Sequence, residues 1–360
     1  MIAISAGFST ERPEDGEKMA MSRGKAGGMR RRAAMMGLAA ALAACAVAPE
    51  RHAAMPKPPP TEEDGAFVMA DGVRLSYRRW LPADRPPKAV ILALHGFNDS
   101  RDAFELSAPA FAAAGIALYA PDQRGFGAAP GRGGWPGSAV LVRDAAHMAR
   151  LLGSDYPAIP LYLMGESMGG AVLLALAASE DAPAVSGYIL AAPAVWGWSE
   201  MNSFLSAALW LSAGVAPNWR LSGTTAHITA SDNRAALIRL STDPLTIHET
   251  RIGTVRGLVD LMDEAQMASR HVTAPTLVLY GGHDELVPKR AMAAAWRRLL
   301  LSAPAGLRLA YYPDGYHLLL RDHERAAAIG DILHWMADPA APLPSGADRA
   351  AALWLDRLGR

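Results

Sequence analysis

A single serine stands between glycines at residues 161–172, LYLMGESMGGAV, where one apolar run gives way to another. Gly165, Ser167 and Gly169 form the pattern G-x-S-x-G, which is typical of a nucleophile elbow when it lies between a strand and a helix. The turn is so tight that the serine takes a strained backbone conformation and its neighbours must be small. We therefore expect Ser167 to present its hydroxyl at the edge of a sheet as a nucleophile; a simple glycine-rich turn is the alternative.

A serine hydroxyl is a poor nucleophile by itself, so a base and an acid that orients this base are required. In the order that accompanies this elbow, the acid and then the histidine follow the serine, each just after a strand. Asp284 follows the apolar run TLVLY, and His317 follows the next run, LRLAYY. We expect His317 to take the proton from Ser167 and Asp284 to hold the imidazole tautomer. Four nearby residues are rivals for the two roles: His283, Asp314, Asp322 and His323.

Two backbone N–H groups are expected to stabilise the negative charge that develops on a substrate carbonyl oxygen. Met168 directly follows the serine at the start of the expected helix, where the helix dipole favours an anion. Phe97 lies in the loop HGFND after an earlier strand, and Gly96 lets that backbone approach the site. His95 in the same loop is interpreted as a structural histidine that orders the loop, with a catalytic base as the alternative.

The loop PDQRGFG, residues 121–127, follows the next apolar run and is expected to shape a wall of the site. Asp122 and Arg124 in this loop carry opposite charges two positions apart. We expect them to form a local pair that stabilises the turn rather than to take part in catalysis.

These polar residues follow a repeated kind of segment, a short apolar run that ends in turn residues, as in a strand covered on both faces. The runs lie at 89–96, 115–122, 161–165, 187–193, 276–284 and 307–315, after a predicted hairpin at 65–82. Between them lie segments such as 138–152, where apolar residues recur at steps of three and four, which indicates a helix. The alternation predicts an α/β protein with a mostly parallel, doubly wound sheet, whose chemistry collects beyond the carboxyl ends of the strands.

The composition fits such a protein and excludes several function classes. The 360 residues are 51% hydrophobic and 19% charged, enough to bury a substantial core. Lys plus Arg and Asp plus Glu both number 35, so no basic surface for nucleic acid is implied. The one cysteine excludes an internal disulfide, the histidines are scattered, and no phosphate-binding loop is present. We therefore expect no metal and no cofactor.

The N-terminal region has the pattern of a secretory signal. At residues 29–50, MRRRAAMMGLAAALAACAVAPE, three arginines precede a short apolar run and a cysteine. The sequence Leu42-Ala43-Ala44-Cys45 resembles the lipobox of bacterial lipoproteins, in which the cysteine is diacylated and becomes the first mature residue. We expect a lipid anchor at Cys45, on the periplasmic side of the bacterial cell envelope. A soluble protein exported by an ordinary signal peptide is the alternative, and the apolar run is too short to span a bilayer comfortably.

This interpretation divides the chain into five parts. Residues 1–28 are a polar extension that is unusual ahead of a signal, so Met29 is a candidate start. Residues 29–45 form the signal segment, 46–64 a proline-rich tether, 65–338 the main domain and 339–360 a C-terminal tail. The tail contains a predicted amphipathic helix that we expect to dock on the main domain through Ala351, Trp354, Leu355 and Leu358.

Six motifs in the main domain, in this order, resemble those of the α/β-hydrolase fold. Within that fold they resemble the monoacylglycerol lipase and lysophospholipase group, the serine aminopeptidase S33-like hydrolases. The motifs are HGFND, DQRGFG, GESMGG, DPL at 243–245, GGHDELVP and GYHLLLRD, and the resemblance covers residues 65–337. It implies an eight-stranded, mostly parallel sheet with a helical cap. Many relatives carry histidine where this chain has Glu166, and the serine nucleophile distinguishes it from the epoxide hydrolases and haloalkane dehalogenases of the fold.

The regular alternation of strands and helices stops between about 194 and 270, where the resemblance implies the cap. The segment VWGWSEMNSFLSAALWLSAGVAPNW is apolar and helical in pattern. We expect its aromatic residues to line an acyl tunnel or to touch a lipid surface, with packing of the cap onto the sheet as the alternative. These residues are Trp196, Trp198, Phe204 and Trp210.

Together, these features predict a cofactor-independent serine hydrolase that cleaves carboxylic esters through an acyl-enzyme. Lipid monoesters are the substrates that the resemblance implies. One alternative is a peptidase or amidase whose acidic cap residues hold an α-amine, with Asp232, Asp243 and Glu249 as candidates. An alternative of another class is a non-catalytic, lipid-anchored envelope scaffold, against which the complete ordered triad argues.

Overall fold

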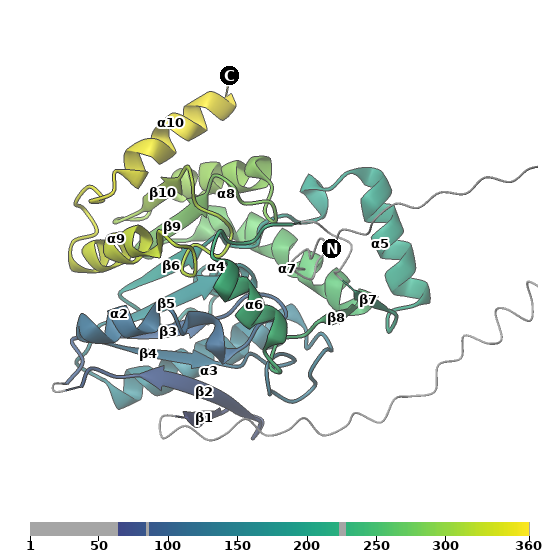
Figure 1. Ribbon diagram of the computed structural model, residues 1–360, viewed down its shortest axis with the longest axis horizontal. Helices are drawn as coiled ribbons and strands as arrows, with labels where there is room; N and C mark the ends of the chain where they lie inside the picture. The colour runs from purple at the N-terminus through teal and green to yellow at the C-terminus, as the bar shows by residue number, and fades with distance from the viewer. Residues whose placement is uncertain (1–63, 84–85, 223–227, 360) are drawn as a thin grey trace, which may run out of the picture. The chain divides into compact units, whose positions relative to one another are not determined.

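The computed structural model describes residues 64–83, 86–222 and 228–359 (Figure 1). The expected signal segment with Cys45, the extension before it and residues 46–63 of the expected tether lie outside the described residues. None of the helices in the described ranges is long and apolar enough to cross a membrane.

An eight-stranded sheet forms the centre of the described chain, and its strand order is β1-β2-β4-β3-β5-β6-β9-β10 (Figure 1). It is mostly parallel, as the sequence predicts, and it has the eight strands that the resemblance implies. The strands are β1 (Asp64–Val68), β2 (Arg74–Trp80), β3 (Ala89–Leu94), β4 (Ile116–Pro121), β5 (Leu161–Glu166), β6 (Gly187–Ala191), β9 (Thr276–Gly281) and β10 (Arg308–Tyr312). β1 and β2 form the predicted antiparallel hairpin, β2 is also antiparallel to β4, and the other neighbours are parallel. The carboxyl ends of the parallel strands therefore meet at one edge.

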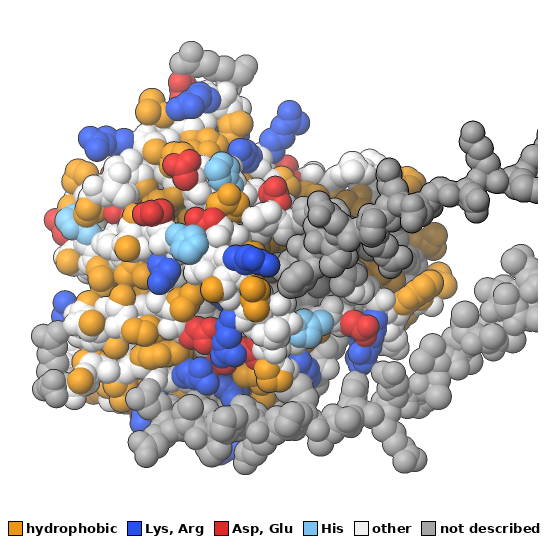
Figure 2. All heavy atoms as spheres, in the orientation of Figure 1, with side chains coloured by type: hydrophobic (Ala, Val, Ile, Leu, Met, Phe, Trp, Pro, Cys, Tyr) orange, Lys and Arg blue, Asp and Glu red, His pale blue; other side chains and the backbone are white. Residues whose placement is uncertain are grey.

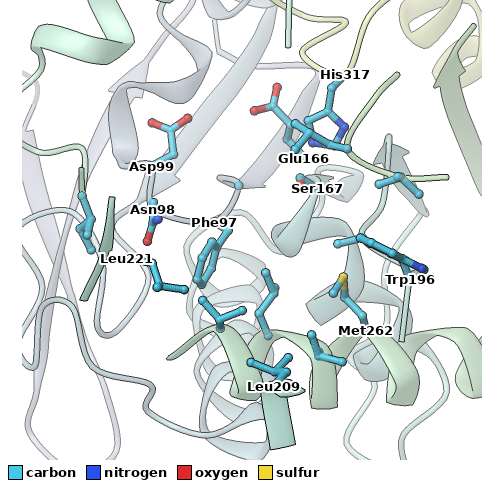
Figure 3. A pocket seen from close by; sticks show the side chains of 18 of the residues that line it. Phe97, Asn98, Asp99, Glu166, Ser167, Trp196, Leu209, Leu221, Met262 and His317 are labelled. Carbon is cyan, nitrogen blue, oxygen red and sulfur yellow. The ribbon is translucent and has the colours of Figure 1, made fainter. Parts of the chain in front are cut away.

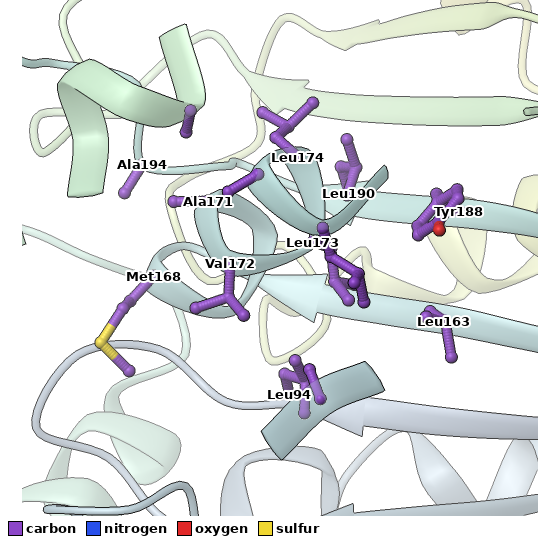
Figure 4. Close-up of a cluster of buried hydrophobic side chains, with 14 of the residues drawn as sticks. Leu94, Leu163, Met168, Ala171, Val172, Leu173, Leu174, Tyr188, Leu190 and Ala194 are labelled. Carbon is purple, nitrogen blue, oxygen red and sulfur yellow. The ribbon is translucent and has the colours of Figure 1, made fainter. Parts of the chain in front are cut away.

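Helices cover both faces of this sheet because successive side chains of a strand point to opposite faces. The helices that flank the sheet are α2 (Ala108–Ala113), α3 (Ser138–Asp155), α4 (Met168–Ala177), α7 (Ile252–Ala268), α8 (Lys289–Ser302), α9 (Arg325–Ala337) and α10 (Ala347–Gly359). One core contains residues of α3, α4, α7, α8 and α10, and Figure 4 shows its centre around Leu94, Leu163 and Leu173. The other core joins Ile91 and the opposite strand faces to Phe111 of α2 and to α9.

The insertion between β6 and β9 forms the cap. Its elements are η2 (Trp198–Glu200), α5 (Ser203–Val215), β7 (Arg220–Ser222), α6 (Arg234–Thr242), β8 (Glu249–Arg251), α7 and η4 (Ser269–His271). The cap is therefore not wholly helical as expected, because β7 and β8 pair as a small antiparallel sheet. Residues of α7 belong to the main core, so the C-terminal part of the insertion is continuous with the sheet domain.

The C-terminal helix α10 docks on the main domain as expected. Ala351 and Trp354 are buried, and the Trp354 ring stacks on Tyr311 of β10 with ring centroids 5.0 Å apart. Trp354 also meets Trp296 of α8 edge-on at 5.0 Å. Leu358, which was expected on the same face, is 39% exposed. Because α10 completes one of the two cores, the tail is part of the hydrolase domain rather than an appendage.

Candidate active site

Ser167 lies in the turn between β5 and α4, in a backbone conformation that ordinary residues rarely adopt. Its φ is 52° and its ψ is −112°, and this strain is held by close packing on both sides. A Cβ atom on Gly165 would lie 2.4 Å from the carbonyl carbon of Gly169, and one on Gly169 would lie 2.2 Å from the carbonyl oxygen of Leu94. Glycine at both positions is therefore a steric requirement of the turn.

Asp284 and His317, from the loops after β9 and β10, form a buried hydrogen-bonded pair. His317 Nδ1 lies 2.8 Å from one carboxylate oxygen of Asp284. The other oxygen accepts hydrogen bonds from the backbone N–H groups of Leu286 and Val287, at 2.8 and 2.9 Å. Asp284 is therefore fixed in place, and it fixes the imidazole ring in turn. Burial disfavours the charged imidazolium, but the charge and hydrogen bond of Asp284 outweigh it and raise the pKa of His317 above its ordinary value.

The structure brings Ser167 and His317 to the same pocket, at the carboxyl ends of the strands (Figure 3). The rivals named from the sequence do not line this pocket. His283, Asp314 and His323 are exposed. Asp322 is buried, but its carboxylate accepts hydrogen bonds from the Ser231 hydroxyl and the Tyr316 N–H.

The two expected oxyanion donors stand on either side of Ser167. Met168 is the first residue of α4, a helix of 10 residues, so its N–H belongs to the unpaired first turn of a helix. Phe97 lines the pocket in the loop after β3. A Cβ atom on Gly96 would lie 3.4 Å from the Ser167 Cβ, so this loop passes directly beside the serine.

His95 is fully buried and serves this loop, in agreement with its structural interpretation. Its Nδ1 lies 2.7 Å from the carbonyl oxygen of Gly96, and its Nε2 accepts the backbone N–H of Gln123 at 3.0 Å. The Gln123 side chain donates to the His95 carbonyl at 2.7 Å. Burial lowers the pKa of His95, which keeps the ring neutral, as this bonding pattern requires. Both ring nitrogens are thereby used, and His95 is not available as a base.

The expectation that Asp122 and Arg124 pair with each other is wrong. Asp122 is fully buried and binds the Arg101 guanidinium at 2.6 Å, together with the backbone N–H groups of residues 101 and 128. Arg124 instead reaches Asp144 of α3 and Asp71 of the β1–β2 turn, both at 2.8 Å. Asp122 and Arg124 therefore fasten this turn to different elements.

A pocket of about 490 Å³ extends from Ser167 beneath the cap, within the size range of small-molecule sites. Its walls are mostly apolar and come from both the sheet domain and the cap, including Phe97, Trp196, Met201, Leu209, Val259 and Met262 (Figure 3). Among the four aromatic residues expected to line a tunnel, only Trp196 does so. Trp198 instead donates its indole N–H to Asp260 at 2.7 Å on the cap surface.

The other two aromatic residues, Phe204 and Trp210, point away from the pocket on α5. Leu205, Leu209 and Ser212 line the pocket at helical spacing, whereas Phe204 is 85% and Trp210 62% exposed. The expectation that they line the pocket is therefore wrong, because α5 is apolar on both sides and only one side faces inward. Orange side chains are visible in Figure 2 along the edge of the molecule that α5 forms.

A buried charge cluster beside the triad was not anticipated from the sequence. Arg321, four residues after His317, binds the Asp99 carboxylate and lies 3.4 Å from Glu166 Oε1. Burial raises the pKa of Glu166 to about 7, against the opposing effect of the Arg321 charge. The signal in the sequence was the presence of charged residues inside apolar motifs, HGFND, GESMGG and GYHLLLRD, but their pairing depends on the fold.

The sheet order, the cap and the nucleophile elbow together define the chain as an α/β-hydrolase. The family model described as serine aminopeptidase, S33 (Hydrolase_4) matches residues 85–324, and the chain belongs to this family. The chain is 28% identical over 280 residues to a monoacylglycerol lipase of Mycolicibacterium smegmatis, covering 77% of this chain and 97% of that one. It is 29% identical over 282 residues to a monoglyceride lipase of Rattus norvegicus, covering 78% and 90%.

Solved structures support the same fold. A monoacylglycerol lipase of Paleococcus ferrophilus superimposes with a TM-score of 0.62 at 20% identity, covering 74% of this chain and 99% of that one. A soluble variant of the monoglyceride lipase of Saccharomyces cerevisiae gives a TM-score of 0.64 at 19% identity, covering 79% and 99%. The family and the curated relatives indicate an enzyme that hydrolyses carboxylic esters.

Proposed function

We propose that this protein is a serine hydrolase that cleaves monoacylglycerol or lysophospholipid-type esters through an acyl-enzyme on Ser167. The observation that carries the proposal is a mostly apolar pocket of about 490 Å³ that Ser167 lines together with His317 of the buried His317–Asp284 pair. An apolar pocket of this size suits one acyl chain, and the ester carbonyl would lie at Ser167 in its wall. The names of the curated relatives support the same substrate class.

The geometry supports the following sequence of steps. Because Asp284 holds Nδ1 of His317 as a donor, Nε2 is left to accept the Ser167 proton. The serine oxygen attacks the ester carbonyl, and the N–H groups of Phe97 and Met168 stabilise the oxyanion. His317 then gives its proton to the leaving alcohol, the C–O bond breaks, and the acyl group stays on Ser167. Water activated by the same histidine releases the fatty acid and restores the serine.

The cap supports a lipid source for the substrate. Its helix α5 carries both residues that line the pocket and exposed apolar side chains, including Phe204, Trp210 and Leu211. Such a surface buries apolar area when it meets a lipid interface.

We also propose that the protein is lipid-anchored through Cys45 on the periplasmic side of the bacterial cell envelope. The basic residues, the short apolar run and the lipobox-like sequence at 42–45 support this location. Metabolic labelling with a fatty acid tests it: the wild type should incorporate label and sediment with membranes, and Cys45→Ser should do neither. An unlabelled, soluble wild-type protein would favour an ordinary signal peptide.

The residues expected to hold an α-amine in a peptidase do not line the main pocket. Asp232 accepts the backbone N–H of His323 at 2.8 Å, Asp243 accepts that of Leu245 at 2.8 Å, and Glu249 is exposed beside Arg220. These bonds give each acid a local structural role. We therefore do not propose the peptidase alternative.

A substrate panel with an active-site probe tests the proposed function. p-Nitrophenyl esters of rising chain length, a monoacylglycerol, a lysophospholipid and an aminoacyl amide are compared on the wild type and on Ser167→Ala. We expect hydrolysis of the long-chain esters, little hydrolysis of the amide, and fluorophosphonate labelling that Ser167→Ala abolishes. Equal labelling of the two proteins, or no hydrolysis of any ester, would contradict the proposal and favour the scaffold alternative.

A further inference from the structure

A cluster of three buried charged side chains lies between the segments that carry the site. Asp99, Glu166 and Arg321 are 6%, 0% and 6% exposed. Arg321 binds the Asp99 carboxylate and approaches Glu166 Oε1 at 3.4 Å, and its Nε donates to the carbonyl oxygen of Ala103 at 2.9 Å. The Arg321 guanidinium is therefore the cation that these two carboxylates share in the buried cluster.

Each member of the cluster stands within a few residues of a group with a proposed role. Asp99 is two residues after Phe97 in the oxyanion loop, and Glu166 directly precedes Ser167 at the end of β5. Arg321 follows His317 by four residues in the loop after β10. The cluster thus joins three loops that must keep a fixed geometry for the reaction, and a misplacement of about 1 Å in such a site can cost on the order of 100-fold in rate.

The charges in the cluster do not balance, because two carboxylates face one guanidinium. Glu166 Oε2 is buried and accepts no hydrogen bond from the described residues. Glu166 and His317 line the same pocket, and the negative charge of Glu166 favours the charged form of His317, as the charges of Asp284 and Asp322 also do. Burial of an uncompensated charge costs desolvation free energy. We therefore ask what the Glu166 charge contributes beside the nucleophile.

We propose that Arg321 and Glu166 are positioning residues for the reaction: Arg321 ties the oxyanion loop and the His317 loop to the elbow, and the Glu166 carboxylate stabilises the imidazolium that forms on His317. This inference rests on the proposed hydrolase function and deepens it. Glu166 does not touch the reacting atoms; it acts through His317 in the steps where that ring holds the serine proton.

Other ionisable groups also bear on the pair and fix what a titration would report. The charges of Asp284 and Asp322 act on His317, and those of Arg321, Asp99 and Asp322 act on Glu166. Two further histidines lie nearby: His95 in the loop after β3, and His248 of the cap, which lines the same pocket. Burial raises the pKa of Glu166 to about 7, so the charge of this carboxylate changes in the neutral pH range. Removing the Glu166 charge removes one stabilising partner of the imidazolium, so the pKa of His317 should fall.

The variant Glu166→Gln keeps the size of the side chain and removes its charge. We expect its kcat on a soluble ester to fall about tenfold at the pH optimum, while the acid limb of kcat/KM moves to lower pH. NMR titration of the His317 ring should show the same displacement without any substrate. The inference would be overturned if Glu166→Gln had the same acid limb of kcat/KM and the same His317 titration midpoint as the wild type.

A matched control separates this role from a general contribution to folding. Asp331 in α9 is also a buried carboxylate, and it binds the hydroxyls of Tyr312 and Ser345 away from the pocket. Asp331→Asn should lower the melting temperature but leave the acid limb and the His317 titration where they are. If it moved them as Glu166→Gln does, the shift would reflect loosened packing, and the inference would be wrong.

Arg321 is tested by a graded pair of variants. Arg321→Met leaves two carboxylates buried without a cation, and we expect a loss of about 100-fold in kcat with a smaller change in KM. Arg321→Lys restores the charge but not the forked geometry, so it should recover part of the loss. No recovery of kcat by lysine in a folded protein would contradict the positioning role. These outcomes are distinct from failure of the proposed function, in which the wild type itself would hydrolyse no ester.

Discussion

The nucleophile elbow and the cap helix α5 are both apolar segments next to the same pocket, but they are constrained in opposite ways. At the elbow, an added Cβ on Gly165 or Gly169 would lie within 2.4 Å of backbone atoms, so the sequence there has almost no freedom. On α5, Leu205 and Leu209 face the pocket while Phe204 and Trp210 face outward, and apolar residues satisfy both sides. We propose that the elbow fixes the chemistry and that α5 affects which substrate enters the pocket.

This contrast predicts that changes at the elbow and its partners affect all esters equally, whereas changes on α5 depend on the physical form of the substrate. A soluble short-chain ester reports mainly on the chemistry. A long-chain ester dispersed in vesicles reports on the chemistry together with access to the pocket. The activity of each variant on these two substrates therefore tests whether the elbow and α5 have different roles.

Removal of the nucleophile or base should have the largest effect. Ser167→Ala or His317→Ala should lower kcat on the order of 10⁶-fold on both substrates, because no other group supplies the oxyanion-forming step. His323→Ala is the matched control, since this histidine is exposed nearby and should retain activity. Single-turnover kinetics, with circular dichroism to verify folding, measure the effect. A loss confined to the vesicle substrate would contradict a shared chemical site.

Asp284→Asn should have the next largest effect. In asparagine an NH₂ group, which donates, replaces the carboxylate oxygen that accepts the hydrogen bond from His317 Nδ1–H. The imidazole is then held in the wrong tautomer, and kcat should fall about 10⁴-fold. Binding of the acyl chain should be little affected, because the substitution is buried behind His317. Parallel measurement of kcat and KM checks this. A change in KM alone would show that Asp284 shapes the pocket instead of orienting the base.

The exposed side of α5 should give a smaller and selective effect. We expect the double variant Phe204→Ser, Trp210→Ser to lose about 10-fold in activity on vesicles and nothing on the soluble ester, since it removes apolar area that meets lipid. The inward-facing control Leu209→Trp should reduce activity on long chains in either form by filling the pocket. Equal losses of the double variant on both substrates would show that the outer face supports the pocket itself.

The dependence on pH should be the mildest effect and the same for both substrates. His317 must be neutral to accept the serine proton. Burial lowers its pKa, but Asp284, together with the charges of Glu166 and Asp322, outweighs this effect and raises the pKa above the ordinary value of 6.5. Activity should therefore rise with pH through a midpoint above 6.5 and fall on the acid side. A pH–rate profile of kcat/KM measures it. A midpoint that differs between the two substrates would indicate that substrate access, rather than His317, is being titrated.

Local pattern was sufficient to predict the sheet domain from the sequence. The continuous apolar runs gave the parallel strands, and the elbow, Asp284 and His317 followed from motifs at the ends of those runs. These features depend on residues close in the chain or on a fixed order along it. The structure places Ser167 and His317 on one pocket, with Asp284 bonded behind His317.

The features that the sequence did not predict depend on contacts between distant residues. Asp122 pairs with Arg101 rather than with Arg124, and Arg321 joins Asp99 and Glu166 across more than 150 positions. The pattern of α5 could not show which apolar side faces inward, because both sides are apolar. Side-chain direction in a helix of this kind is decided by the neighbours it meets, not by its own composition.

The strained backbone of Ser167 has a consequence for the thermal inactivation of the protein. Ser167 keeps its unusual φ only while β5, α4 and the loop after β3 remain pressed together, so its reactivity monitors that junction. Warming that loosens the junction would let the residue relax to an ordinary conformation. On heating, the rate of Ser167 labelling by a fluorophosphonate would then fall at a lower temperature than the helical circular dichroism signal. The labelling rate would therefore report whether the elbow is intact.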